Sequence, residues 1–79
     1  MDLRKKTLQG LRRVRDKEKL SMRVLFTMLS VFREVHAPWI PENDIEGTSQ
    51  WFLGLTPATQ KRLIDDAMGV THAKNEGYL

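Results

Sequence analysis

The sequence predicts an all-α protein, a small bundle of three to four helices. Two observations predict it: apolar residues recur at helical spacing along most of the chain, and capping residues, prolines and glycines stand at the ends of these segments. With 41% hydrophobic and 29% charged residues, the composition is that of a folded globular protein. Seventy-nine residues make one domain, near the lower size limit for a chain that buries a core unaided.

The first segment, residues 1–20, is predicted to be a basic N-terminal helix or arm. Residues 2–19 are good helix formers, with Gly10 as the one weak point. Their apolar side chains form a narrow stripe flanked by charge, which consists of Leu3, Leu8, Leu11 and Val14. Such a stripe docks on a neighbour but makes no core alone, so we expect this helix to be partly frayed or ordered on a partner.

The helical core is predicted to span residues 21–69. Ser21 is a suitable N-cap for a helix over 22–36, and this helix is apolar nearly all round, which places it at the centre of the domain. Nothing in the sequence breaks the chain between residues 17 and 22. The pattern therefore leaves open whether the first two helices run on as one.

A third helix is predicted to have Pro41 in its first turn and to stop at Gly54. Trp39, Trp51 and Phe52 lie close enough in sequence to form one aromatic cluster, and we expect this cluster to seal the core.

The last helix is predicted to have Thr56 as its N-cap and to run over residues 57–68, closed by Gly69. Residues 70–79 follow as an irregular C-terminal tail, in which Asn75 and Gly77 are turn formers.

Charge is unevenly spread along the chain. Residues 1–23 hold nine of the thirteen lysines and arginines and carry a net charge of +6, whereas residues 24–79 carry −3. This asymmetry indicates a basic helix that meets a polyanion or an acidic protein surface. The alternative is a solvated helix face with no partner.

The order of these elements is that of a helix-turn-helix. The stretches SMRVLFTMLSVFREVHAPWIP and DIEGTSQWFLGLTPATQKRLIDDAMG resemble the core of small phage-type winged-helix regulators, similar to the MarR family. The resemblance implies that the helix after Gly-Leu-Thr is a recognition helix. Its base- and phosphate-contacting residues would be Thr56, Thr59, Gln60, Lys61 and Arg62. The stretch THAKNEGYL would then lie where the wing hairpin begins.

Two functions are compatible with these features. The first is a small DNA-binding regulatory protein, in which the N-terminal segment contacts the phosphates of double-stranded DNA through Arg4, Lys5, Lys6, Arg12, Arg13 and Arg15. The second is a small inhibitor or adaptor that binds a larger host protein, as the small size, the segregated charge and the several methionines suggest. Pairing of the 22–35 helices across a two-fold axis would complete a small core as a homodimer.

Other classes of function are not expected. The sequence has no cysteine, its two histidines are far apart, and no catalytic pair of carboxylates, Ser/His/Asp set or phosphate-binding glycine loop is recognisable. We therefore expect no enzyme activity, no metal and no cofactor. No continuous apolar run follows the basic start, so we expect a cytoplasmic protein without a signal peptide or membrane contact.

Overall fold

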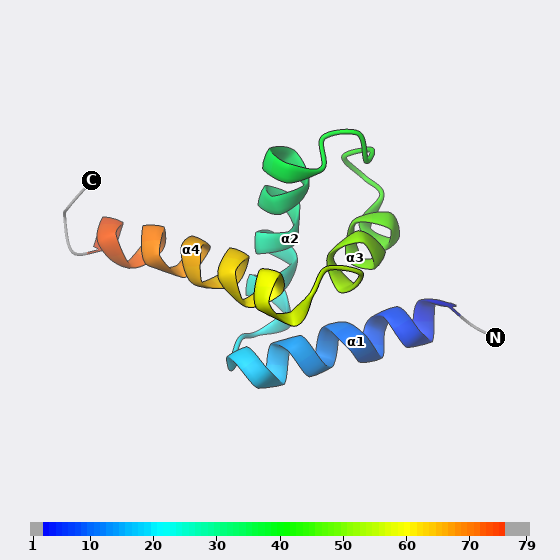
Figure 1. Ribbon diagram of the computed structural model, residues 1–79, viewed down its shortest axis with the longest axis horizontal. Coiled ribbons are helices and arrows are strands. Elements are labelled where there is room, and N and C mark those ends of the chain that lie inside the picture. Colours follow the sequence, from blue (N-terminus) through cyan, green and yellow to red (C-terminus); the bar gives the residue numbers. More distant parts are fainter. Residues whose placement is uncertain (1–2, 76–79) are drawn as a thin grey trace.

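The computed structural model describes residues 3–75 of the protein, and the side chains of residues 4–69. This part of the chain contains four helices and no strand: α1 (Leu3–Glu18), α2 (Met22–His36), α3 (Ile45–Leu53) and α4 (Pro57–Asn75) (Figure 1). The prediction of a small all-α bundle is therefore confirmed. All four helices contribute to the buried core, which consists of Leu11, Leu25, Leu29, Phe32, Phe52 and Ile64.

The first two helices are separate. Lys19 has a positive φ of 56°, and the N–H groups of Lys19 and Leu20 donate to the carbonyls of Asp16 (3.3 Å) and Arg15 (2.9 Å). This pair of bonds is a Schellman motif, which ends α1 with a lysine in the position that glycine usually occupies. Ser21 then caps α2 as predicted, because its Oγ accepts from the N–H of Val24 at 3.1 Å.

Helix α1 belongs to the core and is not a detached arm. Leu11 is only 2% exposed, and α1 packs most extensively on α3. The two helices approach closely at Gly10, where an added Cβ would lie 2.8 Å from Cδ1 of Leu53. The glycine that weakens the helix locally is thus the residue that lets α3 reach it, and of the two predicted forms, helix or arm, this segment takes the first.

Helix α3 begins at Ile45, four residues later than predicted. Residues 41–44 form a turn, in which the N–H of Asp44 donates to the carbonyl of Pro41 at 3.0 Å. Asp44 is the N-cap, since its Oδ1 accepts from the N–H of Gly47 at 2.9 Å. Glycine suits this position because an added Cβ would collide with the capping carboxylate.

The aromatic core differs in part from the prediction. Phe52 is fully buried and stacks on Phe32 of α2, with ring centroids 5.8 Å apart and an interplanar angle of 14°. Trp51 packs half-buried against this core, but Trp39 is 70% exposed and lies outside it. The partner of Phe52 is therefore a residue of α2 and not the nearby tryptophan of the Pro-rich turn.

Helix α4 starts as predicted and continues further. Thr56 caps it, with Oγ1 accepting from the N–H of Thr59 at 3.2 Å. The helix does not close at Gly69 but runs on to Asn75, and its C-terminal part extends away from the other three helices (Figure 1). Residues 70–75 of the predicted tail are thus helical, where the resemblance placed the start of a wing hairpin, and residues 76–79 lie outside the described residues.

Helix α2 is central, as its composition predicts, because it packs against each of the other three helices. One side of it nevertheless remains uncovered. Leu25, Leu29 and Phe32 face the core, whereas Val24 and Val31 are among the exposed large apolar residues.

Candidate nucleic-acid interface

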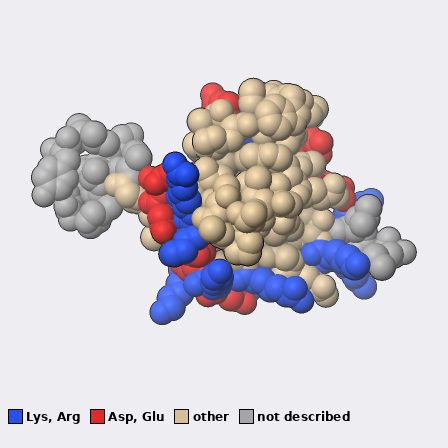
Figure 2. All heavy atoms as spheres, viewed as in Figure 1, with Lys and Arg blue, Asp and Glu red and all other residues tan. Residues whose placement is uncertain are grey.

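The outward face of α1 carries a row of cations. A helix turns by about 100° per residue, so five exposed cations lie about 100–160° round the helix from the buried Leu11, on its outward half. They are Lys5, Lys6, Arg12, Arg13 and Lys17, and we call these five residues the α1 basic face. The exposed Asp16 lies in the same arc. Figure 2 shows blue side chains along the edge of the molecule that α1 forms.

The remaining predicted cations of α1 are placed differently. Arg4 is exposed at the flank of the helix, beside an apolar hollow that it helps to line. Arg15 is half-buried, and its Nε lies 3.0 Å from Oδ1 of Asp16. Lys17 was not among the predicted contact residues. Its helical position, four residues after Arg13, is the sequence signal that would have placed it on the same face.

Gln60 of α4 is used inside the fold. Its Nε2 donates to the backbone carbonyls of Phe52 (3.1 Å), Leu53 (3.4 Å) and Leu55 (3.2 Å). Only the NH₂ end of an amide donates, so three carbonyl partners fix its orientation. These carbonyls lie at the end of α3 and in the turn after it, where helical partners run out. Gln60 therefore caps α3 from the first turns of α4.

The other predicted residues of α4 have mixed roles. The hydroxyls of Thr56 and Thr59 lie 2.8 Å apart within the N-cap. Lys61 forms an i,i+4 pair with Asp65, with Nζ 3.2 Å from Oδ2, and both side chains are exposed. Arg62 is exposed on the same helix.

The start of α4 thus has little net charge. Two cations, Lys61 and Arg62, are followed within one turn by the exposed Asp65 and Asp66. Figure 2 shows this as a mixed group of blue and red atoms over α4, whereas blue atoms outnumber the red ones along the edge that α1 forms. The α1 basic face should therefore attract a polyanion more strongly than the start of α4 does. Helix α4 offers the exposed guanidinium of Arg62, whose planar group of N–H donors can bind two acceptors at once.

The segment from α3 to α4 has the proportions of a helix-turn-helix. The nine residues of α3 are followed by a three-residue turn, residues 54–56, and then by α4. The N–H of Gly54 donates to the carbonyl of Gln50 at 3.0 Å, and that of Leu55 to Phe52 at 3.1 Å. A turn of three residues with a glycine is typical of this motif. Helix α2 packs on both α3 and α4 and so supports the pair.

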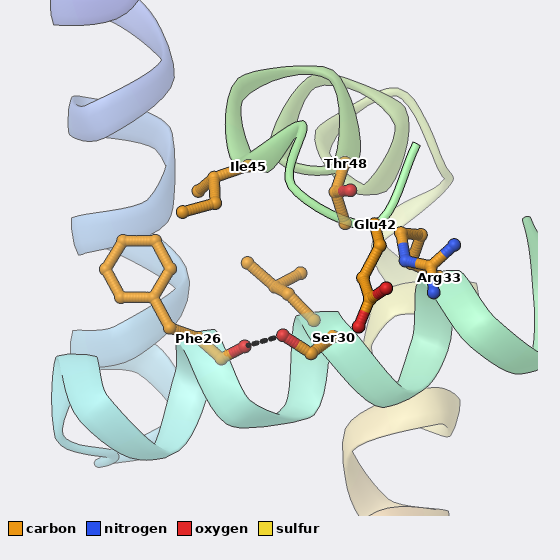
Figure 3. Close-up of a pocket in the computed structure, with 7 residues that line it drawn as sticks. Phe26, Ser30, Arg33, Glu42, Ile45 and Thr48 are labelled. Carbon is orange, nitrogen blue, oxygen red and sulfur yellow. Dashed lines mark hydrogen bonds between the residues drawn. The ribbon is translucent and has the colours of Figure 1, made fainter. Parts of the chain in front are cut away.

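An apolar groove lies on another side, between α1, α2 and α3. One part is an open hollow of about 310 Å³ between Leu8 and Leu11 of α1, Phe26 of α2 and Ile45 of α3. Phe26 and Ile45 also line a second hollow of about 80 Å³ (Figure 3), which Leu29, Ser30, Arg33, Glu42 and Thr48 complete. We call the two together the α1–α3 groove.

The polar residues of the α1–α3 groove mostly bond to nearby backbone. Ser30 Oγ donates to the carbonyl of Phe26 at 3.2 Å, the dashed line of Figure 3. Arg33 Nη1 donates to the carbonyl of Ile40 at 2.8 Å, and Thr48 Oγ1 to that of Asp44 at 2.9 Å. These bonds shape the groove, and they offer no nucleophile paired with a base.

Among the described residues, no group of three His, Asp or Glu side chains is placed to hold a metal ion. Within the same part of the chain, no helix is long and apolar enough to cross a bilayer.

Comparison with known proteins yields no relative: no family model matches the chain, and no curated protein or solved structure is significantly similar.

Proposed function

We propose that the protein is a small DNA-binding regulatory protein that grips duplex phosphates with the α1 basic face. The observation that carries this proposal is the row of five exposed cations on a helix that Leu11 anchors in the core. An anchored helix holds its charges in fixed register, so they bind a polyanion without first becoming ordered. The sixteen residues of α1 extend over about 24 Å, long enough to follow several phosphates.

We assign recognition of the DNA sequence to the residues at the start of α4. Arg62 is exposed and offers the guanidinium fork that pairs with the major-groove edge of guanine, and Lys61 lies beside it. Thr56 caps the start of this helix through the N–H of Thr59, and Gln60 ties the helix to the end of α3. The α1 basic face contributes affinity that does not depend on sequence, and Arg62 contributes the choice of base.

The proposal is tested by titrating a labelled duplex with the protein at increasing NaCl concentration. Five neutralised phosphates predict that log Kobs falls with log[salt] with a slope of about −4 to −5. The variant Arg12→Gln/Arg13→Gln should reduce the steepness of this slope by about 2. A matched variant, Lys61→Gln/Arg62→Gln, removes the same charge from α4.

The two variants separate the roles of the helices. The α1 variant should weaken binding to all duplexes alike, whereas the α4 variant should reduce the difference between preferred and random duplexes. Absence of binding at low salt rejects the proposal. Equal salt slopes for the wild type and the α1 variant would show that the α1 basic face does not contact the phosphates.

A second candidate function is that of a small inhibitor or adaptor that binds a larger host protein. The α1–α3 groove favours it, because an apolar groove between helices suits the apolar face of a partner's amphipathic helix. The variant Ile45→Glu places a charge at the groove and leaves the α1 basic face intact. A docking protein should keep its partner after nuclease treatment and lose it in this variant, whereas a DNA-binding protein should lose its associates to nuclease alone.

A further inference from the structure

Helix α2 has an apolar stripe that no other helix covers. Val24, Val31 and Val35 are 43%, 49% and 64% exposed, and Met28 lies half-buried between them. Their spacing of four, three and four residues places them within an arc of about 60°. This arc lies about 100° round the helix from the residues that face the core. Apolar residues with alternating spacings of four and three form the seam along which two helices pair. We call these four residues the α2 stripe.

We infer that the α2 stripe is the contact surface for a second copy of this chain, with the two α2 helices antiparallel across a two-fold axis. The stripe is symmetric about the midpoint between Met28 and Val31. A two-fold axis at that point places Val24 opposite Val35 of the partner and Met28 opposite Val31 of the partner. All four side chains then meet apolar side chains, as the self-complementarity of a two-fold interface requires.

The charges beside the α2 stripe fit the same arrangement. Arg23 and Glu34 are both exposed and lie along the edge of the stripe that faces away from the core. In the antiparallel register, Arg23 falls within two residues of the partner's Glu34, about 3 Å along the helix axis. Because of the two-fold symmetry, this ion pair between Arg23 and the partner's Glu34 occurs twice in the dimer. In a parallel pair the two-fold axis would run along the helices and carry the partner's Glu34 to the opposite side of the interface from Arg23, so this ion pair would not form.

The size of the protein favours the second copy as the occupant. A chain of 79 residues lies near the lower limit for an independent core, and association with an identical chain adds apolar burial where α2 is exposed. The inference does not rest on DNA binding, since it uses only α2, and it is tested without DNA.

The first test is sedimentation velocity from low to high micromolar protein. The wild type should form dimers, and Val31→Glu should raise the dimer dissociation constant by at least about a hundredfold, because it buries an unpaired carboxylate in each half of the interface. Ile45→Glu is the matched control, since Ile45 is also an exposed apolar residue (63%, against 49% for Val31) but lies on α3. It should dimerise as the wild type does. A wild type that stays monomeric, or equal effects of the two substitutions, overturns the inference.

The second test fixes the register and uses only exposed positions. The natural chain has no cysteine, so Val24→Cys and Val35→Cys each introduce a single thiol. Oxidation of a mixture of the two variants should give a cross-linked dimer, while each variant alone should give little. Cross-linking of Val24→Cys with itself would show parallel helices and overturn the antiparallel arrangement.

The third test reverses the charges. Arg23→Glu and Glu34→Arg should each raise the dimer dissociation constant about two- to tenfold, and the double variant should restore it. Failure of the double variant to recover would show that these two residues do not meet across the axis. Circular dichroism of every variant checks that the helices are retained.

Discussion

The side chain of Gln60 in α4 is hydrogen-bonded to the backbone carbonyl of Phe52 near the end of α3, at 3.1 Å. The same amide also reaches the carbonyls of Leu53 and Leu55. One side chain thus satisfies acceptors at the end of one helix while belonging to the next. The packing of α4 against the end of α3 thus involves a residue to which the resemblance to helix-turn-helix regulators gave a role in DNA contact.

Replacement of Gln60 should destabilise the fold. Gln60→Ala removes the side-chain donor from the carbonyls of Leu53 and Leu55 and leaves that of Phe52 with only the N–H of Leu55, so it should lower the free energy of unfolding by about 1–3 kcal/mol. Gln60→Glu should cost at least as much, because a carboxylate cannot donate to carbonyls. Urea denaturation followed by circular dichroism measures both. Arg62→Ala, an exposed change two residues later, should stay within about 0.5 kcal/mol. Similar losses for Arg62→Ala and Gln60→Ala would contradict the capping role.

Two glycines in helices should respond differently to side chains. At Gly10, alanine gains helix propensity but displaces the tip of Leu53, so we expect a change within about 1 kcal/mol. Gly10→Leu has no room against α3 and should destabilise by about 1–3 kcal/mol. At Gly69 nothing lies within 4 Å of an added Cβ, so Gly69→Ala should stabilise by up to about 1 kcal/mol. Thermal denaturation of the three variants measures these changes in stability. An unchanged stability of Gly10→Leu would show that α1 and α3 are not closely packed.

The Schellman motif at the end of α1 should improve with glycine. Lys19 adopts a left-handed conformation that costs a residue with a side chain about 1–2 kcal/mol. Lys19→Gly should therefore raise the free energy of unfolding by about 0.5–1 kcal/mol, after the entropy that glycine gains in the unfolded chain is subtracted. Lys17→Gly removes the same charge inside the helix and should have the opposite sign. Chemical denaturation of the pair checks the prediction, and a loss of stability in both would contradict it.

The aspartates of α4 should oppose DNA binding if α4 faces the duplex. Asp65→Asn/Asp66→Asn removes two charges and releases Lys61 from its pair, so affinity at low salt should rise about three- to tenfold. Glu42→Gln/Glu46→Gln removes the same charge from exposed positions in and just before α3. Fluorescence anisotropy with one duplex compares them. An equal rise in both variants would indicate a response to net charge alone and would argue against contact through α4.

The sequence predicted the helices because their signals are local. Ser21 and Thr56 are caps whose partners lie three residues away, and the structure confirms both. The predicted start of α3 and the predicted C-terminal end of α4 were less accurate, because the local signals at these two points were misjudged. Asp44 caps α3 at its N-terminus, so Pro41 lies in the turn before the helix, and Gly69 lacks the left-handed conformation that would end a helix.

The contacts between helices were not predictable in the same way. Gly10 reads as a weak point until Leu53, forty-three residues later, is seen to lie against it. Gln60 reads as a polar surface residue until the end of α3 is in place. The α1 basic face, in contrast, follows directly from helical periodicity, because the exposed side of a helix requires no partner to define it.

Leu11 anchors α1 in the core, and α1 is also the most positively charged helix of the described residues. Seven of the sixteen residues of α1 are lysine or arginine, so the helix that completes the core also repels itself. Folding and polyanion binding are therefore thermodynamically linked, since whatever neutralises α1 also favours the folded state. Added NaCl should raise the melting temperature, by about 4–8 °C for each kcal/mol of repulsion screened. A duplex present at a hundred times its Kd should add about 2.7 kcal/mol of stability. A melting temperature that falls with salt would contradict this linkage. If it rises with salt, a ligand that binds the α1 basic face can be detected by the rise in melting temperature that it causes.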